Sequence, residues 1–239
     1  MKQYEGRGEY RCADLPDASE VCLNTNTVVR YTFNQRTRKV EVVSGEASFK
    51  VQSSDSRPFD VQSGGLQVRD LSTSFDVYRR TGSTVMTVID GRVKVRSGLE
   101  FSQAGAEAAW NAAPEYHRLQ QVEFDEATGT LHERHTLTDQ GLSQLLAWRR
   151  GRIDLNGRTL SEALEEFSRY QPIETFNIQD KALRAFKVGG LLESTNLMDF
   201  LDALEFRYHI HHTLKSGADG KTVVTLSRQR NSRPPSQIR

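Results

Sequence analysis

The 239-residue sequence contains few cysteines, tryptophans and prolines, with counts of two, two and six. No apolar run approaches the roughly 18 residues needed to cross a bilayer, and no apolar segment follows the first lysine, as a signal peptide would require. The 32 basic and 31 acidic residues leave a net charge of +1. A general nucleic-acid binder needs an excess of basic residues for its phosphate contacts, so the composition argues against nucleic acid as a partner.

A recognisable catalytic or cofactor-binding motif is also absent from the sequence. His209 and His211 would share one face of a strand, where a metal could bind, but the more common role of such imidazoles is a solvated or partly packed edge. Gly189-Gly190 opens no helix and therefore makes no phosphate-binding loop. No nucleophilic serine motif is present. We therefore expect no enzymatic activity, no catalytic residue, no cofactor and no metal site.

The two cysteines, Cys12 and Cys22, flank a turn-rich segment at residues 15–19. If residues 16–18 form a three-residue hairpin loop, the cysteines lie directly opposite each other, with β-carbons about 4.5–5.5 Å apart. A relaxed disulfide is narrower, so slight distortion would be needed. Two interpretations stay open: a disulfide in an oxidising compartment, or two half-buried thiols. A zinc site is not expected, because zinc needs four ligands.

Residues 10–96 predict an all-β domain. Short runs of alternating apolar and polar residues recur about every eight to twelve residues, with turn signals between them. The turn signals include Ser44-Gly45, Thr81-Gly82 and Asp90-Gly91. Alternation places one face of each strand on a core and the other in water. We expect strands stacked in a sandwich-like or solenoid-like arrangement.

Residues 151–228 have a different pattern, in which helices alternate with strands. Thr159 and Glu162 form a capping box at the start of a helix with apolar residues at helical spacing. A second such helix begins near Thr195 or Asn196. The expected strands are residues 153–155, 173–178, 186–192, 208–211 and 222–226. This order predicts a small α+β domain with repeated βαβ units.

The expected domains are therefore an all-β domain at residues 1–137 and the α+β domain at residues 151–228. Between them, residues 138–150 form a connector that carries Leu142, Leu145 and Leu146 at helical spacing. Residues 229–239 are polar and form a disordered tail.

Several strings, taken in order, resemble the FecR domain. They are Gly45-Glu46-Ala47-Ser48-Phe49-Lys50-Val51, Arg57-Pro58-Phe59-Asp60-Val61, Leu71-Ser72-Thr73-Ser74-Phe75-Asp76-Val77 and Val88-Ile89-Asp90-Gly91-Arg92-Val93-Lys94-Val95. Residues 15–19, followed by Cys22-Leu23-Asn24-Thr25, resemble the opening hairpin of that family, although Ala18 stands where the family usually has glycine. Residues 147–153 lead into a stretch similar to the secretin and TonB short N-terminal (STN) domain. The motif order resembles the periplasmic half of FecR-type sigma-factor regulators.

The resemblance implies a function in cell-surface signalling. FecR-type regulators are anti-sigma factors held in the inner membrane by one helix, and their cytoplasmic domain binds an extracytoplasmic-function sigma factor. Their periplasmic part receives a signal from the N-terminal signalling domain of a TonB-dependent outer-membrane transducer, often a siderophore receptor for iron uptake. The cytoplasmic domain and the membrane helix have no counterpart in this sequence, so we expect it to be the periplasmic sensor part. A periplasmic location favours the Cys12–Cys22 disulfide.

We expect this sensor to bind its partner by strand pairing. An exposed sheet edge accepts a partner's strand through main-chain hydrogen bonds. The candidate edges are residues 152–155 and 222–226, with the helix at residues 160–167 beside the first; core packing is the competing interpretation for the helix. The candidate partner-binding residues are Arg152, Ile153, Asp154, Leu155, Leu160, Leu164, Phe167, Thr222, Val223 and Val224.

Two alternatives stay open. The chain is a structural or secretin-associated module of the cell envelope, since the short domain also occurs there, or it is a carbohydrate-binding module. The second alternative requires exposed aromatic platforms, yet Trp110 and Trp148 both fall near connectors. Sedimentation distinguishes the cell-envelope module from the sigma-factor regulator. A ring or filament favours the envelope module, and a monomer favours the regulator.

Overall fold

The computed structural model describes residues 2–6, 10–53, 57–70, 73–98, 106–171, 173–217 and 221–228. The chain forms two compact units, Met1–Arg150 and Gly151–Arg239. Gly151 is also the residue at which the sequence analysis begins the second domain. The tail at residues 229–239, and Leu71 and Ser72 of one FecR-like string, lie outside the described residues. Within the part of the chain that the structure describes, no helix is both long and apolar enough to span a membrane.

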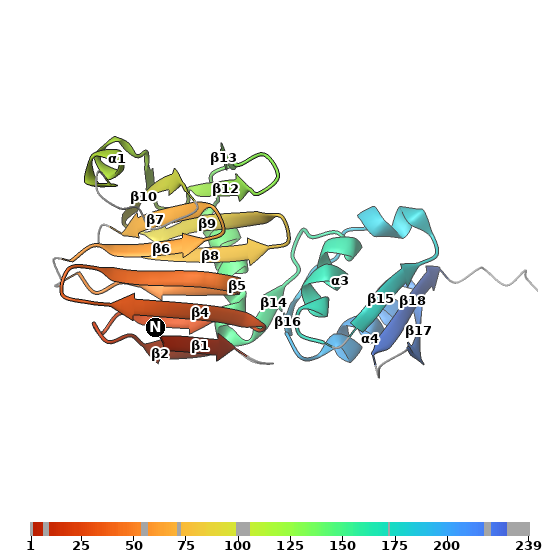
Figure 1. The fold of residues 1–239 in the computed structure, drawn as a ribbon. Coiled ribbons are helices and arrows are strands. Elements are labelled where there is room, and N and C mark those ends of the chain that lie inside the picture. The colour runs from red at the N-terminus through yellow and green to blue at the C-terminus, as the bar shows by residue number, and fades with distance from the viewer. Residues whose placement is uncertain are drawn as a thin grey trace, which may run out of the picture. The chain divides into compact units, whose positions relative to one another are not determined.

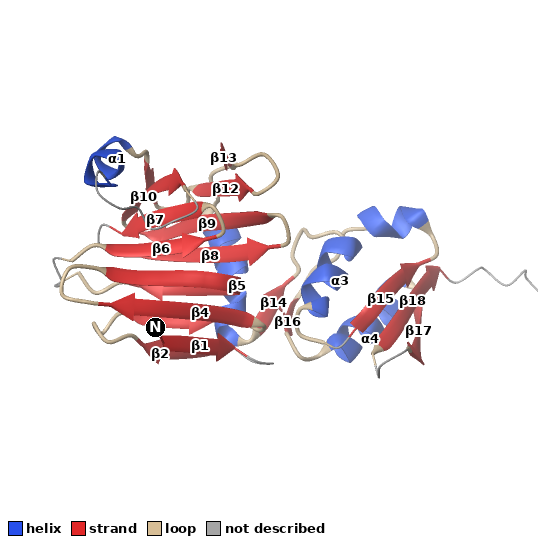
Figure 2. Ribbon diagram, in the orientation of Figure 1, coloured by secondary structure: helices blue, strands red, loops and turns tan. Residues whose placement is uncertain are grey.

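The first unit is mainly β, as predicted (Figures 1 and 2). Its strands are β1 (Lys2–Gly6), β2 (Arg11–Asp14), β3 (Glu20–Leu23), β4 (Thr27–Phe33), β5 (Arg38–Lys50), β6 (Phe59–Ser63), β7 (Leu66–Asp70), β8 (Ser74–Arg80), β9 (Ser83–Asp90), β10 (Arg92–Ser97), β11 (Glu115–His117), β12 (Gln121–Asp125) and β13 (Thr130–Glu133). Over the described residues they pair into one 13-stranded sheet.

The long strand β5 joins the two halves of this sheet. Its first half pairs with β4 and β6, and its second half, from Gly45 onward, pairs with β3 and β8. Strands β1, β7, β10 and β11 extend the first half, and strands β2, β9, β12 and β13 extend the second. Apolar side chains from both halves meet in one core. The sheet therefore curls around that core, with β5 as the strand common to both sides.

Gly45 lies at the point where β5 passes from one half to the other. Its φ is +80°, and a Cβ at this position would lie 2.4 Å from Oγ1 and 2.6 Å from Cα of Thr27. Glycine adopts a positive φ without steric cost, whereas L-residues with a side chain rarely do. Both the backbone angle and the close approach of β4 therefore require glycine here.

The hairpin of β2 and β3 has the register that the sequence predicts. The N–H of Leu15 donates to the carbonyl of Ser19 at 2.7 Å, which leaves residues 16–18 as a three-residue loop. Cys12 then lies directly opposite Cys22, and the two cysteines form a disulfide. The last loop residue, Ala18, has a φ of +62°, the left-handed conformation that such loops require and that glycine adopts most easily.

We expect Ala18→Gly to raise the free energy of unfolding of the first unit by about 0.5–1 kcal/mol, because it relieves the left-handed strain. Both tryptophans, Trp110 and Trp148, lie in this unit, so tryptophan fluorescence during urea unfolding reports on it alone. Ala13→Gly, in strand β2 of the same hairpin, is the matched control and is expected to destabilise by a similar amount. Equal destabilisation by both substitutions would contradict the prediction.

Residues 139–150, which the sequence analysis assigns to a connector, are helical and belong to the first unit. They form α2 (Asp139–Leu145) and the 3₁₀ helix η1 (Leu146–Arg150), visible as the green helix behind the strands in Figure 1. Arg118 forms an ion pair with Asp139 near the start of this segment. Near its end, Arg149 Nη2 lies 3.3 Å from Glu20 Oε1 and 3.8 Å from Cys22 Sγ. The segment thus runs across the sheet from the β11–β12 turn to β3, and we call it the strap.

The strap explains a row of buried polar residues on the outer side of the sheet. Directly paired positions on β3, β5, β8, β9 and β12 are Cys22, Ser48, Asp76, Thr87 and Gln121. Their strand neighbours Phe49, Phe75 and Val122 belong to the core, and alternate residues of a strand point to opposite faces. The row therefore faces away from the core, yet every member is buried. Covering by the strap accounts for this burial.

A second helix, α1 (Ala106–Ala112), is held on β7 and β10 by its tryptophan. The guanidinium carbons of Arg69 and Arg96 lie 4.6 and 4.5 Å from the Trp110 ring centroid. Lys94 Nζ donates to the carbonyl of Trp110 at 3.0 Å, and Arg69 Nη1 donates to Glu107 at 2.8 Å. Trp110 is only 4% exposed, so its function here is to anchor the helix.

The second unit contains helices and strands in the predicted order. They are β14 (Arg152–Asp154), α3 (Leu160–Ser168), β15 (Ile173–Ile178), the 3₁₀ helix η2 (Lys181–Ala185), β16 (Leu191–Glu193), α4 (Leu197–Tyr208), β17 (Ile210–Ser216) and β18 (Thr222–Arg228). Strand β14 pairs antiparallel with β16, while β15, β18 and β17 form a separate three-stranded sheet. Strand–helix–strand order therefore occurs twice, but the strands flanking each helix lie in different sheets, unlike the paired strands of a standard βαβ unit.

The strand predicted at residues 186–192 is shorter than expected and begins later, at Leu191. Gly190 has a φ of +129°, which interrupts extended geometry before β16. The preceding residues form other hydrogen bonds: the N–H of Val188 donates to the carbonyl of Arg158, and the carbonyl of Gly190 accepts from Leu155. These contacts link the segment to the start of α3.

Candidate protein-binding site

Sheet edges are the first candidate for binding a partner's strand. Among the described residues of the second unit, β14 and β16 form a two-stranded sheet, and β15 and β17 flank β18 in the other sheet. Each of these four strands has one edge without a partner strand in the described part of the chain. They are the strands at which a partner strand can add to this unit.

Strand β18 is not an edge, so the prediction for residues 222–226 is wrong. Thr222, Val223 and Val224 pair with β15 on one side and with β17 on the other. The parallel pairing of β15 with β18 joins segments far apart in the sequence. No hairpin turn connects these two strands, so the sequence between them gives no sign that they pair. The main chain of these three residues is thus already paired with strands on both sides within the unit.

Most of the other candidate residues lie in the core of the second unit. Leu160, Leu164 and Phe167 on α3, and Ile153 and Leu155 around β14, are at most 2% exposed. The ring of Phe167 stacks on Phe200 of α4 with centroids 5.1 Å apart. Core packing is therefore the correct interpretation of the α3 residues Leu160, Leu164 and Phe167. The side chains of Ile153 and Leu155 also lie in the core, so at β14 a partner has only the main chain to pair with.

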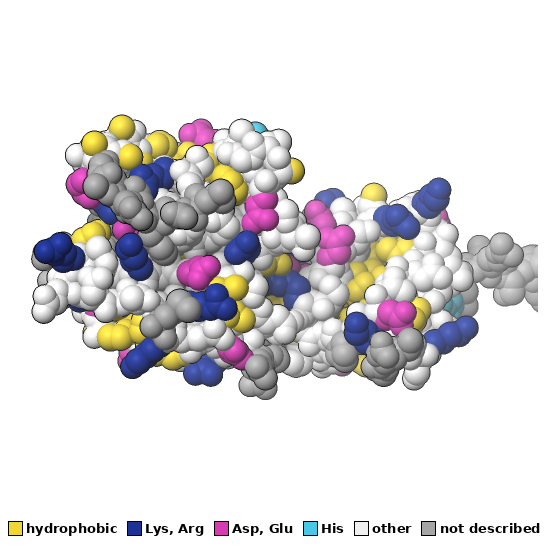
Figure 3. All heavy atoms as spheres, viewed as in Figure 1, with side chains coloured by type: hydrophobic (Ala, Val, Ile, Leu, Met, Phe, Trp, Pro, Cys, Tyr) yellow, Lys and Arg dark blue, Asp and Glu magenta, His cyan; other side chains and the backbone are white. Residues whose placement is uncertain are grey.

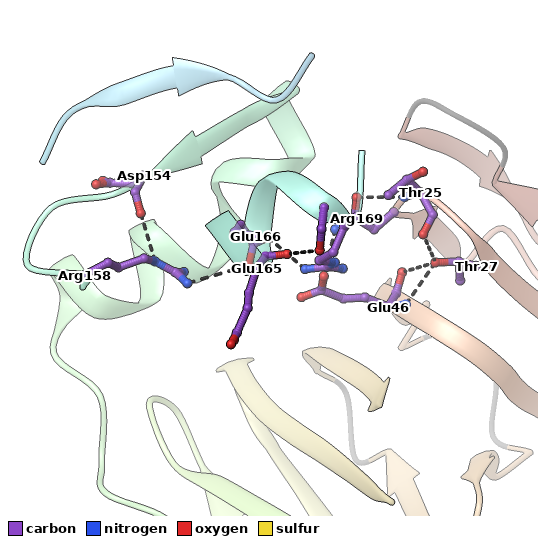
Figure 4. Close-up of polar contacts among 10 residues, drawn as sticks. Thr25, Thr27, Glu46, Asp154, Arg158, Glu165, Glu166 and Arg169 are labelled. Atoms are coloured by element: carbon purple, nitrogen blue, oxygen red, sulfur yellow. Dashed lines mark hydrogen bonds and ion pairs between the residues drawn. The ribbon is translucent and has the colours of Figure 1, made fainter. Parts of the chain in front are cut away.

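Arg152 and Asp154 alone among the β14 candidates retain surface positions. Arg152 Nε donates to Glu193 Oε1 of the paired strand β16 at 3.2 Å. Asp154 leads into a set of polar contacts along α3, drawn in Figure 4. Its carbonyl accepts from Arg158 Nε at 3.1 Å. Arg158 and Arg169 both reach Glu166, at 3.6 and 2.9 Å, so this side of α3 carries a charge-paired surface.

The capping box at the start of α3 is present as predicted. The N–H and hydroxyl of Thr159 donate to Glu162 Oε2 at 2.6 and 2.9 Å, and the Glu162 N–H donates back to the hydroxyl. The backbone hydrogen bond first, and the hydroxyl second, hold the pKa of Glu162 below its ordinary value of 4.5. The charged form of Glu162 therefore stabilises the helix start.

We expect this cap to lose its effect in acid. Because the folded pKa of Glu162 lies below 4.5, its contribution is present above 4.5 and is lost as the pH falls through the folded pKa. At about pH 7, Glu162→Gln should lower the protection of α3 amides in hydrogen exchange by roughly 0.5–1 kcal/mol, a modest value because Glu162 is largely solvent-exposed. The difference between the two proteins should vanish in acid; a constant difference across the pH range would contradict the prediction.

Helix α4 presents exposed apolar side chains that the sequence analysis did not select. Phe206 is 86% exposed and Met198 is 43% exposed, whereas Phe200, Leu201 and Leu204 on the opposite face are buried. One signal was present in the sequence: Phe206 falls outside the apolar stripe that faces the core. An aromatic residue on the polar face of an amphipathic helix indicates a contact surface.

The end of α4 is fastened to β17 by imidazoles and carboxylates. His211 Nδ1 lies 2.8 Å from Glu205 Oε1 and His212 Nδ1 lies 3.2 Å from Glu205 Oε2. His209 caps the helix with a left-handed φ of +53°. The expectation that His209 and His211 share one face of a strand is therefore wrong, because the strand begins only at Ile210.

In the first unit, the opening hairpin is tied to the sheet by a buried ion pair. Arg38 Nη1 of β5 donates to Asp17 Oδ2 at 2.7 Å, and the two side chains are 4% and 1% exposed. Ser19 donates to both carboxylate oxygens of Asp17 through its N–H and its hydroxyl. Arg38 also donates to the carbonyls of Arg57 and Gln52. Asp17 therefore positions the loop from inside the protein and is not available to a partner.

The FecR-like string that begins at Gly45 also has an internal role. Thr27 Oγ1 accepts from the N–H of Glu46 at 2.9 Å and donates to its carbonyl at 3.1 Å (Figure 4). The Glu46 side chain accepts from Asn24 Nδ2 at 2.7 Å. Asn24, Thr27 and Glu46 are all buried. These polar residues fix the crossing of β4 and β5 next to Gly45.

Potential ligand sites in the first unit are limited. In the described residues, the one group of metal-ligating side chains close enough to hold an ion is Cys12, Glu20 and Cys22, and its two sulfurs are bonded to each other. A pocket of about 670 Å³ is lined by Gly64, Gly65 and Phe124 together with charged residues. Arg79 in this pocket already lies 3.4 Å from Glu126.

Known structures share this fold. A crystal structure of a candidate anti-sigma factor from Parabacteroides distasonis ATCC 8503 at 1.65 Å has a TM-score of 0.68 and 21% identity, and covers 96% of this chain and 100% of that chain. A second, at 2.50 Å, has a TM-score of 0.66 and 22% identity, with coverages of 95% and 99%. No curated protein matches the chain. The fold is thus shared along nearly the whole length.

The first unit defines a mainly β domain in which a curled sheet and a buried Asp17–Arg38 pair fix the opening hairpin. Residues 4–94 match the family model of the FecR protein. Residues 4–94 therefore carry a FecR domain, as the motif order indicated. The match ends within β10, so the STN-like character of residues 151–228 stays a prediction.

Proposed function

We propose that this chain is the periplasmic sensor part of a membrane-anchored anti-sigma factor. The observation that carries the proposal is the FecR family match of residues 4–94. The fold shared with candidate anti-sigma factor structures over 96% of the chain supports it. The Cys12–Cys22 disulfide fits an oxidising compartment such as the periplasm.

In this proposal the sensor binds the N-terminal signalling domain of a TonB-dependent outer-membrane transducer, such as a siderophore receptor. The second unit, which we propose to be STN-like, offers the unpaired edges of β14, β15, β16 and β17 for main-chain pairing with that domain. Binding changes the state of an extracytoplasmic-function sigma factor through a cytoplasmic domain joined by a membrane helix.

The sensor itself touches no nucleic acid in this proposal. Its net charge is +1, whereas a nucleic-acid binder gathers lysine and arginine on one face to contact phosphates. On the face drawn in Figure 3, basic and acidic side chains are interspersed. Such a mixed surface is suited to a protein partner with charges of both signs.

The proposal is tested by direct binding. The purified chain is immobilised, and the signalling domain of the TonB-dependent receptor encoded beside its gene is titrated by biolayer interferometry. We expect saturable binding with a Kd below tens of micromolar, whereas the signalling domain of a receptor from another locus should bind at least about tenfold more weakly. Absence of binding at tens of micromolar contradicts the proposal.

The carbohydrate-binding alternative is not favoured by the aromatic residues. Trp110 and Trp148 are 4% and 3% exposed, so neither offers a stacking platform for a sugar. Trp110 lies between the guanidinium groups of Arg69 and Arg96, and Trp148 lies in the strap. Sedimentation tests the other alternative, a structural module of the cell envelope. We expect a monomer if the chain is part of a sigma-factor regulator.

A further inference from the structure

The exposed face of α4 carries a regular stripe of three side chains. Met198, Asp202 and Phe206 are spaced four residues apart and so lie along one ridge of the helix. All three are exposed, and Phe206, at 86%, is the most exposed large apolar side chain of the described residues. Solvated apolar groups at both ends of one ridge, with a carboxylate between them, are suited to a partner groove with two apolar pockets.

Most charged side chains beside this stripe are carboxylates. Asp199 and Glu205 lie beside Asp202 on the exposed side of the helix, while Arg207 lies about 100° further round from Phe206. Asp202 Oδ1 lies 3.8 Å from His212 Nε2, but the Asp202 side chain is still 68% exposed, so a partner can reach it. A complementary surface must therefore carry lysine or arginine next to its apolar pockets.

The helix end that carries Phe206 is held in place. Glu205, its neighbour, is fastened by His211 and His212 of β17, and the N–H of His209 donates to the carbonyl of Glu205 at 3.1 Å. A fixed backbone lowers the ordering cost when an aromatic side chain enters a pocket. The aromatic ring is thus presented from a preorganised position.

From these observations we infer that Met198, Asp202 and Phe206 form the contact ridge for the signalling domain, with Phe206 as its aromatic anchor. This inference rests on the proposed function and adds a side-chain contact on the second unit to the proposed strand-edge pairing. The occupant is a protein surface with an apolar pocket edged by basic residues. It binds the outer side of α4 and leaves the core of the second unit intact.

The test compares variants of the full chain against the same signalling domain from the neighbouring receptor gene. Phe206→Ala should weaken the Kd at least about tenfold. Asp202→Lys should weaken it and flatten its dependence on salt. Tyr10→Ala, which removes another exposed aromatic side chain, at 41% exposure in the first unit, is the matched control and should stay within about twofold. Alanine favours helix and Phe206 makes little core contact, so an unchanged Tm is expected for Phe206→Ala.

The outcomes separate the inference from the function on which it rests. No binding by the unmodified chain overturns both. Binding that Phe206→Ala leaves unchanged overturns the inference alone, and a loss confined to Tyr10→Ala moves the contact to the first unit. Sedimentation of the chain at tens of micromolar completes the test: a dimer that Phe206→Ala dissolves would assign the ridge to a second copy and overturn the stated occupant.

Discussion

Replacement of Gly45 by alanine is expected to lower the free energy of unfolding of the first unit by about 2–5 kcal/mol. Two costs add. A φ of +80° costs an L-residue about 1–2 kcal/mol. The new Cβ would also lie 2.6 Å from Cα of Thr27 and 2.9 Å from the carbonyl oxygen of Asn26. Backbone atoms of a paired strand cannot rotate away, so overpacking adds about 1–3 kcal/mol.

Gly82→Ala separates these two costs. Gly82 has almost the same φ, +82°, but no atom lies within 4 Å of the position that a Cβ would take there. This control therefore measures the backbone strain alone, about 1–2 kcal/mol. Urea unfolding followed by tryptophan fluorescence measures both variants, because Trp110 and Trp148 lie in the first unit. If Gly45→Ala costs no more than Gly82→Ala, the close approach of β4 is not rigid and our account of the crossing is wrong.

Local features of the fold were predictable from sequence because few neighbouring residues determine them. Loop length alone places Cys12 opposite Cys22. Four consecutive residues determine the cap of α3, and Thr159 and Glu162 form it as predicted. The order of strands and helices in the second unit also follows from hydrophobic periodicity, which each segment carries within itself.

Long-range strand order was not predictable in the same way. The position of β18 between β15 and β17 depends on a parallel pairing in which Ile173 lies opposite Thr222. Hydrophobic alternation gives the faces of a strand but not its neighbours. An exposed edge and a central strand therefore look alike in sequence, and the assignment of Thr222, Val223 and Val224 to a sheet edge was wrong for this reason.

The exposure of each strand face also depended on a distant segment. Ser48, Asp76 and Thr87 alternate with core residues, a pattern that predicts contact with water. The strap covers them, and its own short apolar pattern gave no indication of where it would pack. By contrast, the core positions of Leu160 and Phe167 were readable from helical spacing, and the same spacing leaves Phe206 outside the buried face of α4.

Asp17→Ala is expected to lower the free energy of unfolding of the first unit by about 3–5 kcal/mol, the usual cost of leaving one charge of a buried pair without its partner. The pair with Arg38 has a separation of 2.7 Å, and its side chains are 1% and 4% exposed. Loss of Asp17 also removes the acceptor for the N–H and hydroxyl of Ser19. Urea unfolding followed by tryptophan fluorescence measures the change.

Two further variants decide whether the loss comes from the unpaired charge. Replacing Arg38 by methionine in the Asp17→Ala background removes that charge while keeping apolar volume, and should recover part of the stability. Glu41→Gln breaks the exposed first-unit pair with Arg30, in which the Glu41 and Arg30 side chains are 40% and 37% exposed, and should cost no more than about 1 kcal/mol. A loss below about 1 kcal/mol for Asp17→Ala would show that the pair contributes no more than a surface contact. The expected result instead assigns the aspartate of the opening hairpin to holding β2 and β3 on β5, so its presence in the FecR-like motif follows from folding and requires no contact with a partner.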